Sequence, residues 1–194
     1  MENNMSKTII IDNYDSFTYN LVQIVNEIQD EEVTVRRNNE TTIEEVATFD
    51  HIILSPGPGL PEEAGLLKDI IKELGSTHKI LGVCLGLQAI GEVYGAKLKN
   101  LDRVFHGIQS EFVQSENISV IFKGVSLIFQ AGRYHSWVVD KKTISDDLIV
   151  TARGEFGEIM AAQHKTHQVY GVQFHPESIM TPEGSKIVEN FLKI

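Results

Sequence analysis

The sequence contains little of what would define several other classes of protein. Its 194 residues include one cysteine, and 17 basic side chains stand against 27 acidic ones. A single cysteine forms no internal disulfide, and no second cysteine or tight histidine group offers a zinc site, so we expect no metal in this chain. The formal net charge of -10 would repel nucleic acid, and no cluster of lysine and arginine is available to release counterions from phosphates.

Long hydrophobic runs are also missing. The polar segment Met1 to Lys7 is followed by an apolar run of only a few residues, too short for a signal peptide or a membrane span. We therefore expect a cytoplasmic protein that does not associate with membranes. With 42% hydrophobic and 23% charged residues, and with no internal repeat or linker, residues 1–194 are predicted to form a single globular domain.

The order of apolar patterns predicts an α/β fold. In the first half, short apolar runs alternate with helical periodicity, which is typical of βα units on a mainly parallel sheet. Strands are expected at 7–11, 32–36, 51–54 and 79–83, with helices at 17–28 (capped by Ser16), 42–46, 65–74 and 85–94. In the second half, shorter runs predict antiparallel strands added to the sheet at 118–122, 137–139, 148–151 and 169–174, before a last helix at 183–192.

The lone cysteine stands at a predicted turn between a strand and a helix. In Gly82-Val-Cys-Leu-Gly86 the thiol lies between two glycines, as in the nucleophile elbow of serine hydrolases. A strand that reverses sharply into a helix leaves no room for a Cβ at the flanks and forces the central residue into an unfavourable conformation. We expect Cys84 to be exposed at the carboxyl edge of the sheet, with the positive end of the following helix favouring its thiolate. Most free cysteines are buried core residues, but the flanking glycines argue for a nucleophile here.

A base for this thiol is available in Gly171-Val-Gln-Phe-His-Pro-Glu177. His175 follows a predicted strand, and Glu177 lies two residues later, on the same side of extended backbone. One imidazole nitrogen could then face Cys84 while Glu177 orients the ring, as the third member of a catalytic triad does. A His-x-Glu pair alone is weak evidence, because most such pairs are surface groups. Its weight comes from occurring together with the cysteine turn.

Attack on an amide carbonyl also needs two N–H donors near the sulfur. The amide of Leu85, directly after the cysteine, is one candidate. The loop Ser55-Pro-Gly-Pro-Gly59 leaves a strand expected beside the cysteine strand, and Pro58 has no N–H, so the donors narrow to Gly57 and Gly59. Gly57 is the preferred second donor. A rigid turn without any ligand is the alternative.

Taken together, these motifs resemble the class I, or triad, glutamine amidotransferases, and the resemblance covers essentially the whole chain. It rests on four motifs in the expected order, namely Ser-Pro-Gly-Pro-Gly at 55–59, Gly-Val-Cys-Leu-Gly-Leu-Gln at 82–88, Tyr-His-Ser-Trp at 134–137 and Gly-Val-Gln-Phe-His-Pro-Glu-Ser at 171–178. Within the family, the opening segment at 12–21, Asp-Asn-Tyr-Asp-Ser-Phe-Thr-Tyr-Asn-Leu, is similar to glutaminases that serve chorismate-using synthases.

The resemblance implies a flavodoxin-like open sheet with its site at the carboxyl ends of the strands, and a Cys84, His175 and Glu177 triad that releases ammonia from L-glutamine. It also implies glutamine contacts from Gly57, Pro58, Gly59, Leu85, Gln88, Ser136 and Trp137, of which Ser136 and Trp137 act largely through backbone groups. It implies no cofactor in this chain. The implied partner is the chorismate-binding large subunit of anthranilate synthase (component I) or of aminodeoxychorismate synthase, where Mg²⁺ is expected.

Two positions depart from the family pattern. Leu87 stands where many members carry a polar residue, and Trp137 stands where many carry leucine. Two other functions compete with this interpretation. An independent cysteine hydrolase of the same fold would act without a partner, and a catalytically silent regulatory or redox subunit would use Cys84 only as a reactive thiol. The opening motif and Gln88 argue against the first, and the complete triad argues against the second.

Overall fold

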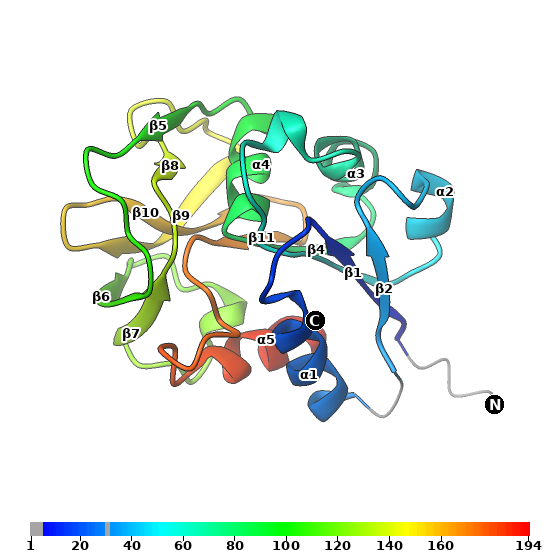
Figure 1. Cartoon of the computed structure of the whole chain (residues 1–194). Coiled ribbons are helices and arrows are strands. Elements are labelled where there is room, and N and C mark those ends of the chain that lie inside the picture. Colours follow the sequence, from blue (N-terminus) through cyan, green and yellow to red (C-terminus); the bar gives the residue numbers. More distant parts are fainter. Residues whose placement is uncertain (1–5, 30–31) are drawn as a thin grey trace.

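The computed structural model describes residues 6–29 and 32–194, which form one large sheet, a small two-stranded sheet and helices on both faces of the large sheet (Figure 1). The strands are β1 (Thr8–Asp12), β2 (Thr34–Arg37), β3 (His51–Leu54), β4 (Lys79–Val83), β5 (Leu98–Asn100), β6 (Ile108–Gln114), β7 (Ile128–Arg133), β8 (Trp137–Val139), β9 (Leu148–Gly154), β10 (Ile159–His164) and β11 (Val169–Val172). The α-helices are α1 (Thr18–Ile28), α2 (Ile43–Val46), α3 (Leu67–Leu74), α4 (Leu85–Val93) and α5 (Gly184–Leu192), and short 3-10 helices lie at Pro61–Glu63 and Val120–Phe122.

The large sheet is parallel on one side and antiparallel on the other. Its strand order is β2-β1-β3-β4-β11-β10-β9-β6-β7, and β5 pairs with β8 separately. From β2 to β11 the strands are parallel, and from β11 to β7 each neighbouring pair is antiparallel. The predicted α/β class with antiparallel strands added in the second half is therefore confirmed. One part was wrong in detail: the run at 169–174 forms β11 only as far as Val172, and this strand pairs parallel with β4 on one side and antiparallel with β10 on the other.

Alternate residues of the central strands face two separate hydrophobic layers. In β1, Ile10 packs into the cluster that contains Leu21 of α1 and Val188 of α5. Ile9 and Ile11 face the opposite cluster, which includes the buried apolar residues of α3 and most of those of α4. Both faces are covered, so β3 and β11 are buried along their whole length, as expected for parallel strands between helical layers. Within the described residues, no helix is both long enough and apolar enough to span a bilayer.

Two helices, α1 and α3, begin later in the sequence than predicted. The predicted Ser16 cap is wrong: Phe17 occupies the N-cap without a side-chain hydrogen bond, and α1 begins at Thr18. Asp12 supplies the polar contact instead, because its Oδ1 accepts a hydrogen bond from the Thr18 hydroxyl at 2.8 Å. The helix expected from residue 65 begins only at Leu67, because Gly65 has a φ of 52°, outside the right-handed helical region.

The run at 118–122 was predicted as a strand, and this was wrong. Residues Val120–Phe122 form a 3-10 turn instead, in which the Phe122 and Ile121 side chains are buried in the core beside α5. Three long strands, β6, β7 and β10, were not predicted. In β6 and β7 exposed and buried residues alternate, and several exposed positions are polar. Pairing with neighbouring strands stabilises them: β6 pairs with β7 and β9, and β10 pairs with β9 and β11.

Candidate active site

The cysteine turn has the strained geometry expected of a nucleophile elbow. Cys84 lies between β4 and α4 with φ 53° and ψ -99°, in a region that side-chain-bearing residues rarely adopt. A Cβ on Gly82 would lie 2.5 Å from the carbonyl carbon of Gly86, and one on Gly86 would lie 2.9 Å from the Leu54 carbonyl oxygen. Both glycines are therefore required by close backbone approach, as predicted.

The thiol itself is less accessible than expected. Cys84 is only 6% exposed, so the prediction of an exposed sulfur was wrong. It lines a cavity of about 200 Å³, smaller than the roughly 300–1,000 Å³ of most ligand pockets. The cavity is lined by Gly57, Pro58, Gly59, Cys84, Gln88, Tyr134, His135, Ser136 and Trp137. Of the residues predicted to hold the substrate, only Leu85 is not part of this lining.

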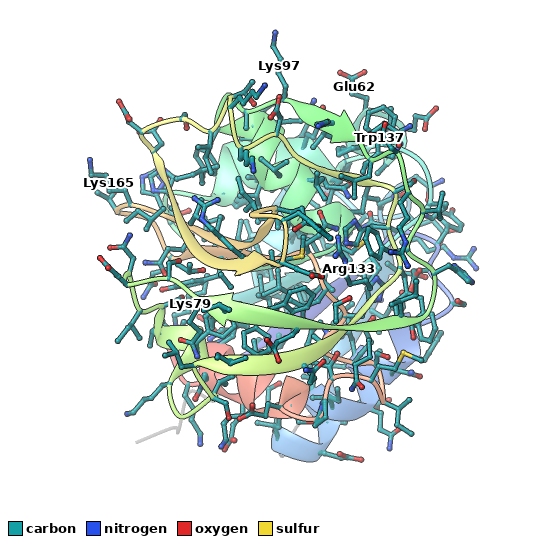
Figure 2. The ribbon with its side chains drawn as sticks, turned by 90° about the vertical axis from the view of Figure 1, so that its left-hand side faces the viewer. Glu62, Lys79, Lys97, Arg133, Trp137 and Lys165 are labelled. Carbon is teal, nitrogen blue, oxygen red and sulfur yellow. The ribbon has the colours of Figure 1, made fainter. Side chains whose placement is uncertain are left out.

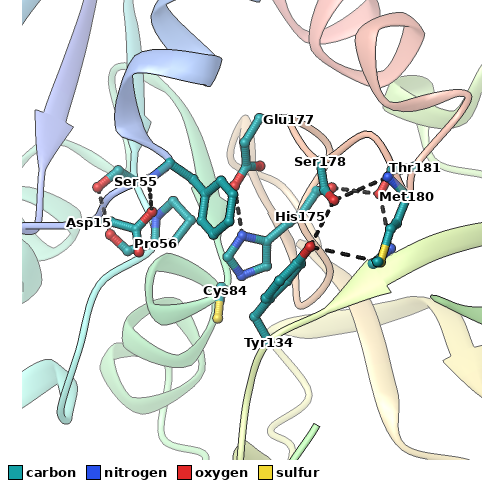
Figure 3. Close-up of polar contacts among 12 residues, drawn as sticks. Asp15, Ser55, Pro56, Cys84, Tyr134, His175, Glu177, Ser178, Met180 and Thr181 are labelled. Atoms are coloured by element: carbon teal, nitrogen blue, oxygen red, sulfur yellow. Dashed lines mark hydrogen bonds and ion pairs between the residues drawn. The ribbon is translucent and has the colours of Figure 1, made fainter. Parts of the chain in front are cut away.

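His175 and Glu177 meet beside the cysteine (Figure 3). The His175 Nδ1 lies 2.6 Å from Glu177 Oε1, and both residues are buried. Because a carboxylate only accepts, Nδ1 carries the proton, which leaves Nε2 as the nitrogen available to a neighbouring thiol. The His175 Nε2 has no hydrogen-bond partner among the described residues. Figure 3 shows the sulfur of Cys84 on this side of the ring.

The backbone of His175 is fixed from the antiparallel side of the sheet. Its N–H donates to the Gly132 carbonyl at the end of β7, at 3.1 Å. Its own carbonyl accepts a hydrogen bond from the Thr181 hydroxyl at 2.6 Å, and the Gly132 N–H donates to that hydroxyl at 3.0 Å. His175 therefore sits three residues beyond the end of β11, but on rigid backbone.

Two aromatic rings enclose the imidazole. The ring of Tyr134 lies 4.7 Å from that of His175, and the ring of Phe17 lies 5.9 Å away and meets it edge-on. The Tyr134 hydroxyl is placed by Ser178 Oγ at 3.1 Å. These contacts hold the imidazole in position and exclude water from it, which strengthens its electrostatic interactions with Cys84 and Glu177.

The electrostatics favour a charged imidazole. Burial alone lowers the pKa of His175, but its interactions with Cys84 and Glu177 outweigh burial and raise that pKa well above the ordinary value. Burial also raises the pKa of Asp15, a nearby carboxyl in the loop before α1. The arrangement therefore suits a thiolate and imidazolium pair supported by one buried carboxylate.

The 55–59 loop is held by an asparagine that sequence reasoning did not single out. Asn13 donates from its side chain to the Ser55 carbonyl at 2.8 Å and from its backbone to Ser55 Oγ at 2.9 Å. The loop packs so closely that a Cβ on Gly57 would lie 2.6 Å from both the carbonyl oxygen and the Cβ of Asn13, and 2.9 Å from the Leu85 side chain. The opening motif thus supports the candidate oxyanion loop directly.

Gly57 and Leu85 remain the candidate oxyanion donors. Leu85 is the first residue of α4, where backbone N–H groups have no partner inside the helix. In the described residues no acceptor is paired with the N–H of either Gly57 or Leu85. The strand that leads into the 55–59 loop is paired with the cysteine strand, as predicted.

The remaining predicted substrate residues are placed mostly by their backbone. The Ser136 carbonyl accepts a hydrogen bond from the Leu101 N–H at 2.8 Å, and the Trp137 carbonyl accepts one from Gln88 Nε2 at 2.9 Å. The Trp137 carbonyl accepts a second hydrogen bond from His135 Nδ1 at 3.0 Å, so both of its lone pairs are engaged. Leu87 is fully buried, and a Cβ on Gly171 would lie 2.6 Å from its Cδ1, which explains an apolar residue at this position.

Three further residues touch the site without having been predicted. Gln173 donates to the Cys84 sulfur at 3.4 Å, His135 lines the cavity, and Tyr134 packs on His175. All three lie inside motifs already noted, so their position next to the predicted residues was the available signal. No group of three or more metal-ligating side chains occurs within residues 6–29 and 32–194.

The chain belongs to the class I glutamine amidotransferase family, whose pattern (Glutamine amidotransferase class-I) it matches over residues 9–194. It is 47% identical over 195 residues to anthranilate synthase component 2 of Saccharolobus solfataricus, covering 97% of this chain and 98% of that protein. It is also 47% identical to the bifunctional protein TrpGD of Thermotoga maritima, covering 98% of this chain but only 32% of that longer protein.

A third relative is the aminodeoxychorismate/anthranilate synthase component 2 of Bacillus subtilis, at 43% identity over 187 residues and 95% of both chains. Among solved structures, a Thermoplasma acidophilum protein described as a GMP synthase subunit superposes with a TM-score of 0.87 at 24% identity, over 97% of this chain and 93% of that one. At that identity the match supports the fold alone.

Proposed function

We propose that this protein is the glutaminase subunit of an anthranilate synthase, which hydrolyses L-glutamine and passes ammonia to a chorismate-binding large subunit. The observation that carries the proposal is the Cys84, His175 and Glu177 constellation at a cavity of about 200 Å³ that most of the predicted glutamine contacts line. The relatives named anthranilate synthase component 2 or beta subunit support the choice of partner.

In the proposed reaction, His175 Nε2 takes the proton of the Cys84 thiol, and the sulfur attacks the side-chain amide carbon of glutamine. The tetrahedral intermediate carries its negative charge on the former carbonyl oxygen. The N–H groups of Gly57 and Leu85 are the donors proposed for that oxygen. Glu177 keeps the proton on His175 Nδ1 and stabilises the imidazolium that forms.

Collapse of the intermediate breaks the carbon–nitrogen bond, and the imidazolium gives its proton to the departing ammonia. Water, deprotonated by the now neutral His175, then attacks the glutamyl thioester and releases glutamate and the thiol. These steps need no metal or organic cofactor from this chain. Mg²⁺ remains an expectation for the partner subunit only.

A partner is part of the proposal because ammonia is protonated and lost in bulk water near neutral pH. A glutaminase that acted alone would release it unused. We therefore propose that the isolated chain is a weak glutaminase and that docking of the large subunit completes its oxyanion site. A missing donor would cost roughly 2.7–4 kcal/mol of transition-state stabilisation.

A second candidate is a subunit shared by the tryptophan and folate branches of chorismate metabolism. The specific observation in its favour is the Bacillus subtilis relative, whose name includes both aminodeoxychorismate and anthranilate synthase. The glutaminase chemistry is the same in both cases. Only the product of the partner subunit differs.

The deciding experiment titrates the purified chain with each of the two large subunits and measures glutamate, anthranilate and aminodeoxychorismate. We expect an anthranilate synthase large subunit to raise glutamine turnover by at least ~10-fold, with a further rise on adding chorismate, through linkage between the two sites. Activation by both large subunits would establish the shared role. Full glutaminase activity in the free chain, unchanged by either subunit, would favour an independent hydrolase.

A further inference from the structure

Two buried glutamines connect the Trp137 carbonyl to the sulfur of Cys84. The Nε2 of Gln88 lies 2.9 Å from the Trp137 carbonyl oxygen and 3.3 Å from the Oε1 of Gln173. The Nε2 of Gln173 in turn lies 3.4 Å from the Cys84 sulfur. Gln173 is completely buried and Gln88 is 3% exposed, so both amides are largely shielded from solvent.

The orientation of both amides follows from the first acceptor. A backbone carbonyl can only accept, so Gln88 must direct its NH₂ group toward Trp137. The second N–H of Gln88 then donates to Gln173, which must present its Oε1. This leaves the NH₂ group of Gln173 for Cys84. The direction of every hydrogen bond in this path is fixed, and it ends with an N–H donor on the sulfur.

The Trp137 carbonyl is itself held by His135. The Nδ1 of His135 lies 3.0 Å from this oxygen, and its Nε2 lies 3.2 Å from the Nε of Arg133. The carbonyl requires a proton on Nδ1, and the guanidinium, which only donates, requires a bare Nε2. Both neighbours therefore select the same neutral tautomer. Burial and the charge of Arg133 lower the pKa of His135 to about 3, in agreement with this assignment.

Arg133 cannot easily move away from this position. Its side chain is 2% exposed, its Nη2 lies 3.0 Å from Glu158 Oε1, and its guanidinium carbon lies 3.4 Å from the ring centroid of Phe105. A buried, paired and stacked guanidinium is a rigid support. Figure 2 shows Arg133 within the body of the molecule, with Trp137 in the segment above it.

We propose that Gln173 is a further catalytic residue, whose N–H stabilises the Cys84 thiolate. His135 is then a positioning residue: it holds the Trp137 carbonyl, and this carbonyl keeps the amides of Gln88 and Gln173 correctly oriented. The inference rests on the proposed function only in taking Cys84 as the nucleophile. An N–H donor on a developing thiolate lowers the energy of the charged form more than that of the thiol.

Other charges act on the same sulfur and are unchanged by neutral substitutions in this path. His175 and Glu177 belong to the segment after β11, and Asp15 lies in the loop before α1 with electrostatic contact to both. Arg133 and His135 approach from the end of β7 and the following segment. A change in thiolate population in a Gln173 variant therefore reports the lost donor.

The test measures thiolate directly, through the rate at which iodoacetamide alkylates the protein as a function of pH. Cys84 is the only cysteine in the sequence, so the signal has one source. The midpoint is the pH at which the alkylation rate reaches half of its maximum. In Gln173→Met, which keeps the side-chain length but removes the donor, we expect this midpoint to rise by about one pH unit. This rise corresponds to ~10-fold less thiolate at neutral pH. Gln173→Leu, which is also neutral and also lacks the donor, should raise the midpoint by a similar amount and serves if the first variant does not fold.

His135 is tested by a matched pair of substitutions. The side-chain amide of Asn can donate from a position close to Nδ1, whereas Leu cannot, so His135→Asn should keep a near wild-type midpoint and His135→Leu should lose about threefold in thiolate. Gln114→Met removes another buried glutamine, far from the site, whose NH₂ group binds the Val125 and Ser126 carbonyls, and should not move the midpoint.

An unchanged midpoint in the folded Gln173 variants would overturn the catalytic role of Gln173. Equal midpoints in His135→Asn and His135→Leu would overturn the positioning role. The measurement uses neither glutamine nor a partner subunit. A failure of the proposed glutaminase activity would leave these midpoints unaffected, so the two hypotheses fail separately.

Discussion

The parallel and antiparallel sides of the sheet contribute to the site in different ways. The parallel side supplies Cys84 and the 55–59 loop from the ends of β4 and β3, whose strands are almost entirely apolar and buried. The antiparallel side supplies His135 and Trp137 from the segment after β7, and holds them through buried polar contacts such as the pair of Arg133 and Glu158. One side positions its residues by close backbone packing, and the other by hydrogen bonds and charge.

Cys84 and the polar residues on the antiparallel side should therefore respond to different kinds of change. On the parallel side, adding a single methyl group at a glycine disturbs the geometry. On the antiparallel side, removing a single charge leaves another charge buried without a partner.

The largest effect on activity is expected from Cys84, which follows β4 on the parallel side of the sheet. Cys84→Ser should reduce glutamine-dependent synthesis by the complex at least ~10^3-fold, because the thiolate nucleophile is lost. Ammonia-dependent synthesis should survive, since only the partner catalyses that step. The assay compares product formation with glutamine and with ammonium salts, and retained glutamine-dependent activity would refute the nucleophile assignment.

On the antiparallel side, Glu158→Gln should lower the free energy of unfolding by about 3 kcal/mol, because Arg133 stays buried with its charge uncompensated. Urea unfolding measures the change. Adding Arg133→Met to the same chain should restore part of the loss. Glu111→Gln, at an exposed position of β6, is the control, and an effect of Glu158→Gln no larger than that of this control would contradict the prediction.

Glycine substitutions compare the two sides directly. A Cβ on Gly82 would meet backbone of Gly86 at 2.5 Å, whereas a Cβ on Gly132 would meet the Ser178 hydroxyl at 3.0 Å and other side-chain atoms. Side chains can shift and backbone cannot, so Gly82→Ala should cost about 2–3 kcal/mol of stability and Gly132→Ala about 1 kcal/mol. Thermal and urea unfolding of both variants give the order, and the reverse order would show that packing does not distinguish the two sides.

The last prediction concerns pH. Burial lowers the pKa of His135 to about 3 in the folded protein, whereas its ordinary pKa is 6.5. Between pH 6.5 and pH 3 the histidine is therefore protonated in the unfolded chain but neutral in the folded protein. Stability is therefore lost as pH falls from 6.5 toward 3, by up to about 1.4 kcal/mol for each pH unit. Between pH 6.5 and 5, the unfolding free energy of His135→Asn should therefore fall less steeply with decreasing pH than that of the wild type, by up to about 1.4 kcal/mol per pH unit. An unchanged slope would mean that His135 is charged in the folded protein.

Several parts of the fold and the site were predictable because their signals are local. The bounds of β3 and β4 match the predicted strands, since continuous apolar runs ended by a Pro/Gly loop or a Gly-flanked cysteine leave few alternatives. The contact between His175 and Glu177 follows from two residues separated by a proline. The clash that excludes a side chain at Gly82 also arises within one short turn.

The α/β class, the strand-to-helix turn at Cys84 and the contact between His175 and Glu177 thus follow from the sequence alone. Only the tertiary structure decided that β11 lies parallel beside β4, that Asn13 holds the 55–59 loop, and that Gln173 reaches the sulfur of Cys84. These contacts join residues 42 to 89 positions apart. No local pattern specifies them, because they depend on how strands far apart in the chain are ordered in the sheet and on which buried polar groups must then satisfy one another.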